Sequence, residues 1–282
     1  MRVRLKHKMC VRYTAPPQRG ALFESNDKVV DCKMEFLYAA ELKKQFTCYG
    51  HFYECLLMNG ERVKCRSVLE IVDATIPQHI PSDISEMQPD VVVIMMNPGS
   101  SHPKDIFHVD EDIEYPSSAR SMRKELVLTQ PDNTQYQVMR VAVRQGWHHI
   151  RVLNLSDLRD PKSGSFLQKV EELSGIIGGH VHSIFCAERS AELAHALKRR
   201  LNTPILLGWG QDLGLVPLAE QCMKQIREET VCTVASDVHP LLNAHPSPML
   251  QSKKLQWLEA MNREVEQTFE LKSKKKGDSA RE

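Results

Sequence analysis

Paired cysteines are missing from this sequence. Eight cysteines occur among the 282 residues, but they are scattered and no two of them form a Cys-x-x-Cys pair. Closely spaced pairs of that kind supply the thiolates of structural zinc and iron–sulfur centres. We therefore expect reduced thiols, no disulfide scaffold, no bound metal and no other cofactor.

Long hydrophobic runs are also missing. No apolar stretch approaches the roughly 20 residues that a membrane-spanning helix requires. The basic segment Met1–Lys8 is followed neither by an apolar run nor by a small-residue cleavage site, so we expect no secretory signal. We expect a monomeric protein of the cytoplasm with no membrane contact.

An excess of charge of one sign is lacking as well. The chain has 37 lysines and arginines against 36 aspartates and glutamates, which gives a formal net charge of +1. A protein that binds phosphate without regard to base sequence usually carries an excess of basic residues. If this chain contacts DNA, a local basic patch must supply the attraction.

The sequence does contain a repeated pattern of strand and helix. From about Asp90 onward, short apolar runs alternate with amphipathic stretches, which indicates βα units feeding a parallel sheet. The expected strands are Val91–Met96, Ile150–Asn154, Ser183–Cys186, Ile205–Trp209 and Val231–Ala235. The expected helices cover residues 133–145, 166–177, 189–201, 216–228 and 251–269. We predict an α/β fold with three layers, α/β/α, around a central, mainly parallel sheet of about four to five strands.

The first 85 residues follow a different pattern. Apolar and polar residues alternate at Val29–Ala40, and Asn59-Gly60 is a dipeptide suited to a tight hairpin turn. We predict an N-terminal antiparallel accessory layer that a linker at Ile76–Met87 joins to the core. The predicted domains are residues 1–85 for this β-rich segment, residues 86–270 for the α/β domain and residues 271–282 for a charged, flexible tail.

Candidate functional residues follow the expected strands. Ligands of a parallel α/β sheet bind just beyond the carboxyl ends of its strands, so we expect these segments to converge if the sheet is doubly wound. The segments are Asn97-Pro98-Gly99-Ser100-Ser101, Asn154-Leu155-Ser156-Asp157, Gly208-Trp209-Gly210 and His245-Pro246-Ser247-Pro248.

Taken in this order, the segments resemble the uracil-DNA glycosylase superfamily. The shared features are an Asx-Pro turn, a Val-Leu-Asn strand end, a Leu-x-Trp-Gly strand end and a His-Pro-Ser-Pro loop, which together span roughly residues 90–261. The His-Pro-Ser-Pro loop is the most specific of them. Residues 132–161 also resemble an uncharacterised bacterial family. The resemblance implies an enzyme that flips a pyrimidine out of DNA, hydrolyses its N-glycosidic bond and leaves an abasic site.

The resemblance implies two catalytic residues. As the N-glycosidic bond breaks, the base leaves as an anion and the sugar becomes an oxocarbenium-like cation. The site therefore needs a donor to the base carbonyl oxygen and a group that orients water. His245 would be the donor, and Asn97 would position the water. Asn97 cannot abstract a proton as the aspartate of another branch would, so we expect slower chemistry.

Base recognition would involve another set of residues. Asn154 carries both a donor and an acceptor with which to read the base edge. Phe107 is the expected stacking platform, with Tyr115 as the second choice. Gly99 stands where the uracil-specific branch has a bulky tyrosine. A pocket formed with Gly99 and Ser100 could therefore admit thymine, or a cytosine or uracil enlarged at C5, including the modified bases of some phages.

The expected DNA contacts lie in the same loops and in the helix that follows. Hydroxyls beside rigid prolines could contact phosphate, an apolar side chain could fill the gap left by the flipped base, and lysines could form a local phosphate patch. The phosphate contacts would come from Ser101, Pro246 and Ser247. Met249 or Leu250 would fill the gap, and Lys253 and Lys254 would form the phosphate patch.

Other interpretations stay open. Asn97-Pro98-Gly99 suits a turn that binds no ligand, and Asn154 suits a simple strand cap. The principal functional alternative is a non-catalytic module that binds nucleic acid or a nucleotide in the same pocket. A hydrolase of free nucleosides or nucleotides is a further alternative. An acidic loop could be merely solvated or could hold a divalent cation through His108, Asp110, Glu111 and Asp112.

Overall fold

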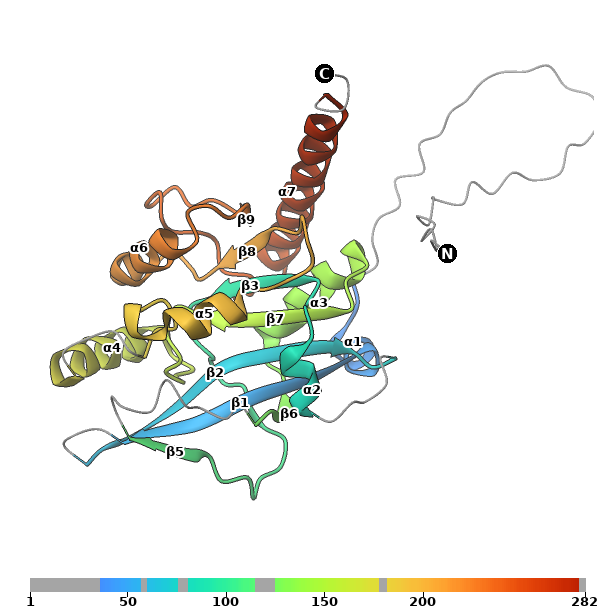
Figure 1. Ribbon diagram of the computed structural model, residues 1–282. Coiled ribbons are helices and arrows are strands. Elements are labelled where there is room, and N and C mark those ends of the chain that lie inside the picture. The colour runs from blue at the N-terminus through green and yellow to red at the C-terminus, as the bar shows by residue number, and fades with distance from the viewer. Residues whose placement is uncertain (1–35, 57–59, 76–80, 115–124, 178–181, 279–282) are drawn as a thin grey trace, which may run out of the picture. The chain divides into compact units, whose positions relative to one another are not determined.

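The structure is a computed structural model that describes residues 36–56, 60–75, 81–114, 125–177 and 182–278 (Figure 1). Tyr115, Asn59 and the part of the alternating stretch before Phe36 lie outside the described residues. None of the helices in the described ranges is both long and apolar enough to cross a membrane.

The described residues form a nine-stranded sheet with the order β4-β6-β1-β2-β7-β3-β8-β9, and β5 pairs with β1. Four neighbouring strands, β7, β3, β8 and β9, are parallel, which confirms the expected α/β class and the expected parallel core. Their bounds are His149–Asn154, Val91–Met95, Ile205–Gly208 and Val231–Thr233. The strand expected at Ser183–Cys186 is wrong, because this segment turns on itself and leads into the 3-10 helix Ala187–Arg189.

The sheet is larger and more antiparallel than expected. The predicted hairpin is present as β1 (Phe46–Leu56) and β2 (Arg62–Asp73), but β2 also pairs with β7 in antiparallel fashion. The hairpin therefore extends the parallel core and does not form a separate layer. The reason is that eight consecutive residues of β2 are buried, so both faces of this strand need covering. The short strands β4 (His102–Pro103), β5 (Glu111–Glu114) and β6 (Val127–Gln130) complete this side.

Helices cover both faces of the sheet, as the three-layer prediction requires (Figure 1). On β3, Val92 and Ile94 pack into one apolar cluster with α4, α5 and α6, whereas the alternate residues face a second cluster with α1, α3 and α7. This alternation follows from the two-residue period of a strand. The helices are α1 (Ala39–Gln45), α2 (Pro81–Glu86), α3 (Asn133–Gln145), α4 (Ser163–Ile177), α5 (Ser190–Ala196), α6 (Val216–Gln225) and α7 (Gln251–Asp278).

Helix α3 begins and ends where the sequence predicts. Asp132 is its N-cap and accepts hydrogen bonds from the backbone N–H groups of Thr134 and Gln135, and Gly146 ends it in a left-handed conformation. Helix α5 is shorter than expected. Helix α7 is longer and continues beyond residue 270, where a flexible tail was expected.

Candidate functional site

The candidate site is a cavity of about 740 Å³ at the carboxyl ends of β3 and β8. The chain leaves β3 toward α3 on one face of the sheet and leaves β8 toward α6 on the other. Neighbouring strands that diverge in this way create a crevice at which α/β proteins bind ligands. The predicted residues that line the cavity are Asn97, Gly99, Ser100, His245, Ser247 and Met249.

Asn97 has a fixed amide orientation. Its Nδ2 donates to the carbonyl oxygen of Asp160 over 2.7 Å. Because the nitrogen is used in this way, the amide oxygen is the atom left to accept a hydrogen bond from a ligand or a water molecule. The geometry therefore suits the amide oxygen of Asn97 to orient a water molecule. An amide is not basic enough to take a proton from that water.

His245 is held as a neutral ring. The backbone N–H of Ser247 donates to His245 Nδ1 over 3.2 Å, so Nδ1 carries no proton. Burial lowers the pKa of His245 below its ordinary value of 6.5 and thereby favours the uncharged form. A neutral imidazole with an unprotonated Nδ1 carries its hydrogen on Nε2, which makes Nε2 a donor.

The His-Pro-Ser-Pro loop is anchored from behind by buried groups. Pro246 is buried, and its carbonyl oxygen accepts from Gln137 Nε2 over 3.0 Å. Trp257 Nε1 donates to the carbonyl oxygen of Ala244 over 3.0 Å. Pro246 was expected to contact DNA. The structure instead buries it against the end of β8, where it positions His245.

Gly99 has a local reason to be glycine. Its φ is 63°, in the left-handed region, and a Cβ added there would lie 2.9 Å from Asp132 Oδ2 at the start of α3. The turn after β3 can therefore approach the N-terminus of α3 closely only with glycine at this position. A larger residue at position 99 would disturb this turn as well as the cavity.

Two predicted residues lie behind the lining of the cavity. Asn154 and Ser101 are each 0% exposed, and neither belongs to the lining. Ser101 is therefore not placed to touch a DNA phosphate. Within the described part of the chain, the Nδ2 and Oδ1 atoms of Asn154 have no hydrogen-bond partner, and Ser101 Oγ has none either. Buried polar groups without partners are uncommon and call for a ligand or water.

Arg66 is the functional candidate that the sequence does not single out. It lies on β2, is 1% exposed and lines the cavity. Its Nε and Nη1 atoms find no hydrogen-bond partner among the residues described. The only signal in the sequence is a charged residue in a hairpin strand, which an outward-facing side chain explains equally well.

Aromatic and basic residues are placed differently from the prediction. Phe107 is 83% exposed and does not line the cavity, because its loop leaves the site after β4. Trp209 lines the cavity instead, with its Nε1 bonded to the carbonyl oxygen of Leu241. Lys253 and Lys254 lie in the first turn of α7 and outside the lining.

The rim of the cavity carries one of the two predicted apolar wedge residues, and the other follows it in the chain. Met249 is 98% exposed and lines the cavity, and Leu250 beside it is 64% exposed. Such large exposed apolar side chains are free to contact a partner molecule.

Comparisons of the chain with known protein families, curated proteins and solved structures found no match.

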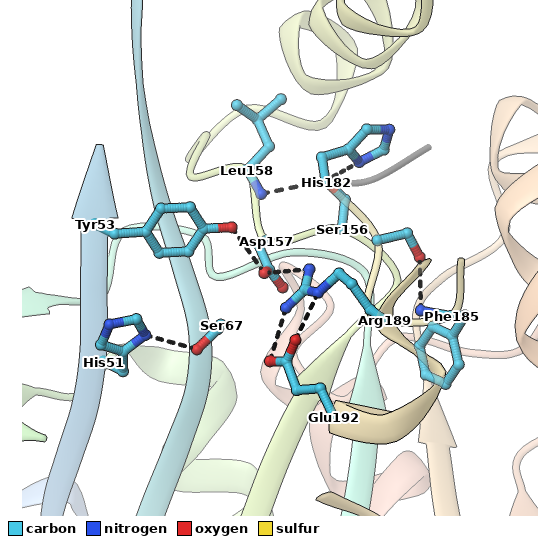
Figure 2. Close-up of polar contacts among 11 residues, drawn as sticks. His51, Tyr53, Ser67, Ser156, Asp157, Leu158, His182, Phe185, Arg189 and Glu192 are labelled. Atoms are coloured by element: carbon cyan, nitrogen blue, oxygen red, sulfur yellow. Dashed lines mark hydrogen bonds and ion pairs between the residues drawn. The ribbon is translucent and has the colours of Figure 1, made fainter. Parts of the chain in front are cut away.

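A buried polar network fixes the loop between Asn154 and Asp160 (Figure 2). Asp157 Oδ2 accepts from Tyr53 Oη over 2.9 Å and from Arg189 Nη1 over 2.7 Å. Arg189 also forms a double hydrogen bond with Glu192. Burial disfavours the charge on Arg189, but the two carboxylates outweigh it and raise the pKa of the guanidinium well above its ordinary value. The network therefore fixes Asp157, which lies three residues before Asp160, the residue whose carbonyl oxygen accepts from Asn97.

A second cavity, of about 760 Å³, lies between β2 and α5. Its buried charged side chains are already paired. Glu70 bonds to His149 and to Arg151, and Arg189 belongs to the network described above. Because these groups satisfy one another, this cavity is the weaker candidate for a ligand site.

The acidic loop has protein partners for its carboxylates. Asp110 lies 3.5 Å from His108 and 3.8 Å from Arg159, and Asp112 pairs with Arg62. Across the described ranges, no group of three or more His, Cys, Asp or Glu side chains is arranged to hold a metal ion.

Proposed function

We propose that this chain is a DNA glycosylase that hydrolyses the N-glycosidic bond of a flipped pyrimidine and leaves an abasic site. The observation that carries the proposal is that Asn97 and His245, far apart in the sequence, line one cavity in complementary hydrogen-bonding states. One offers an acceptor for water, and the other offers a neutral donor for a base oxygen. We also propose that the protein acts as a monomer in the cytoplasm.

Asn154 supports a role for this cavity in reading a base. Its amide is buried at the end of β7, which pairs with β3 beside Met95, the last residue of that strand. A free donor and a free acceptor on one amide match the alternating groups on a pyrimidine edge. Because Asn154 is buried behind the lining, its contact with a bound base requires the lining beside Met95 to move.

The substrate could carry a group at C5, because Gly99 adds no side chain to the cavity wall. Substitution of Gly99 by tyrosine is a poor test, since the left-handed φ and Asp132 both oppose any larger residue. The better test keeps the protein intact and varies the base. Release of uracil without release of any C5-substituted pyrimidine from defined oligonucleotides would rule out the open wall.

The decisive experiment is to measure base release and alkali-labile breaks in oligonucleotides that carry uracil, mismatched thymine or a C5-modified cytosine. We expect wild-type protein to release at least one of these bases. Asn97→Ala and His245→Ala should each slow the release by about 10²- to 10³-fold, the effect typical of losing one well-placed hydrogen-bonding group. Arg144→Gln, on the exposed side of α3, is the control variant that should keep the rate.

Three outcomes would contradict the proposal. DNA that is bound but never loses a base indicates the non-catalytic module. Release from free nucleosides but not from oligonucleotides indicates a nucleoside hydrolase. Full activity in both Asn97→Ala and His245→Ala would remove the proposed mechanism, whatever base is released.

A further inference from the structure

Arg66 is buried at the cavity and forms no ion pair within the described part of the chain. Asp132, the carboxylate with the largest electrostatic effect on Arg66, uses Oδ1 to cap α3 through Thr134 and Gln135, and no ion pair joins it to Arg66 within the described residues. Burial lowers the pKa of Arg66 to about 10, while Asp132 opposes this shift. The guanidinium therefore stays positively charged at neutral pH. A buried cation that forms no ion pair is costly, which makes a purely structural role a poor explanation.

A β-bulge aims Arg66 at the cavity. In the β1–β2 hairpin, His51 pairs with Val68 and the next residue, Phe52, pairs with Arg66, so Ser67 is an extra residue. Val68 packs on the side of α4, α5 and α6, and strict alternation would send Arg66 to that same side. The extra residue moves Arg66 to the side of α3, whose N-terminus lines the cavity. Bulges next to active sites are known to redirect side chains in this way.

The bulge is held in place by its own contacts. Ser67 Oγ bonds to His51 Nδ1 over 2.8 Å, and both side chains are buried (Figure 2). The backbone N–H of Arg66 donates to the carbonyl oxygen of Asp157 over 2.8 Å. Arg66 is thereby fixed relative to the loop that carries Asn154 and Asp160.

We propose that Arg66 is a further catalytic residue, whose guanidinium holds the base oxygen on which negative charge develops during bond cleavage. The role rests on the proposed glycosylase function. The C1′–N1 bond breaks and its electron pair leaves with the base, where it is delocalised onto the carbonyl oxygens of the base. Water adds to C1′ and loses a proton to solvent, and the released base anion takes up a proton from solvent. A fixed positive charge in a buried site stabilises this anion strongly.

The depth of Arg66 favours the base over a backbone phosphate as its partner. Arg66 extends from an interior strand and is almost wholly buried, whereas Ser100 and Lys162 are exposed parts of the lining. Groups at the mouth are the ones within reach of a DNA backbone. A flipped base is the part of the substrate that enters the cavity.

The test compares the rates of base release, under single-turnover conditions, from oligonucleotides that carry uracil or 5-fluorouracil. Fluorine withdraws electrons and stabilises the base anion by itself, so 5-fluorouracil depends less on Arg66. We expect Arg66→Met to slow uracil release by about 10²- to 10³-fold and 5-fluorouracil release by a smaller factor. Arg66→Lys keeps the charge and should recover part of the rate.

Thermal unfolding separates this role from a structural one. Because Nε and Nη1 of Arg66 have no hydrogen-bond partner among the described residues, Arg66→Met should leave the melting temperature unchanged or raise it. Arg199→Met is the matched control: this guanidinium is paired with Glu229 away from the cavity, so its loss should lower the melting temperature and leave the rate ratio of the two bases unchanged. If Arg66→Met does not fold, Arg66→Gln provides the same comparison.

The outcomes are distinguishable. A wild-type chain that releases none of uracil, 5-fluorouracil, mismatched thymine and C5-modified cytosine overturns the proposed function and this role with it. A wild-type chain that releases both, with variants of Arg66 slowing both by the same factor or not at all, overturns only the role of Arg66.

Discussion

Gly208 lies so close to Pro246 that no side chain fits between them: a Cβ on Gly208 would come within 2.9 Å of Pro246 Cγ. Gly208 is the last residue of β8, and Pro246 follows the proposed catalytic His245. This contact fixes how the His-Pro-Ser-Pro loop sits on the sheet.

Gly208→Ala should therefore displace His245. We expect a loss of stability of about 1–3 kcal/mol, as is typical of overpacking, and a clear fall in the rate of base release. Urea denaturation and single-turnover kinetics measure the two effects. Gly164→Ala is the control for stability, because a Cβ there meets no atom within 4 Å. Equal stability of both variants would show that the His-Pro-Ser-Pro loop can move away from Gly208 at no cost in stability.

Asn97→Asp should lower both the stability of the protein and its rate of base release, although an aspartate is a stronger base than an asparagine. The substitution removes the Nδ2 donor and places a carboxylate oxygen against the carbonyl oxygen of Asp160, which Asn97 now approaches to 2.7 Å. We expect lower stability, by about 1–3 kcal/mol, because a buried acceptor is left unpaired. We also expect slower base release. Faster release by Asn97→Asp at unchanged stability would contradict this account of Asn97.

His245 should give stability a particular pH dependence. The unfolded chain protonates this ring near its ordinary pKa of 6.5, whereas burial lowers the pKa in the folded chain. Between these two values the unfolded state binds more protons, so stability falls as the pH decreases through this interval and levels off below it. His245→Gln should lack this component. Urea denaturation of both proteins from about pH 5 to about pH 8 measures the difference, and an opposite slope would contradict the pKa direction.

Asp157→Asn should lower the free energy of unfolding more than a substitution at the surface does. It leaves Arg189 with one carboxylate in a buried site, and we expect a loss of about 3–5 kcal/mol. Glu266→Gln, which breaks a partly exposed pair with Arg144, should change stability far less. Equal losses in the two variants, measured by urea denaturation, would mean that the Asp157 network does not hold the loop.

Met249→Ala tests the wedge at the rim. Met249 is 98% exposed, so its truncation should leave the melting temperature unchanged. If the side chain fills the gap left by a flipped base, the rate of release from duplex DNA should fall while the rate from single-stranded DNA stays nearly constant. Equal effects on both substrates would remove this role.

The α/β class, the parallel strands and the limits of α3 could be predicted because each depends on local signals. Apolar runs mark β3, β7, β8 and β9, and Asp132 and Gly146 cap α3 through contacts with their own neighbours. The convergence of Asn97 and His245 on one cavity follows from the rule that ligands bind at the carboxyl ends of parallel strands.

Other features depended on contacts that no local pattern encodes. Ser183–Cys186 is apolar enough for a strand but has no place in the sheet, and the pairing of β2 with β7 turned an expected accessory layer into part of the core. Ser101 and Pro246 are buried because distant segments cover them.

The sequence by itself determined the strands of the parallel core, through their apolar runs, and predicted the proposed catalytic pair through the resemblance of the Asn97-Pro98-Gly99 and His245-Pro246-Ser247-Pro248 loops to a known superfamily. Only the tertiary structure decided that Arg66 faces the same cavity. One extra residue, Ser67, reverses the face of β2 on which Arg66 lies, and a bulge of this kind is set by pairing with β1 and not by the residues of β2 alone.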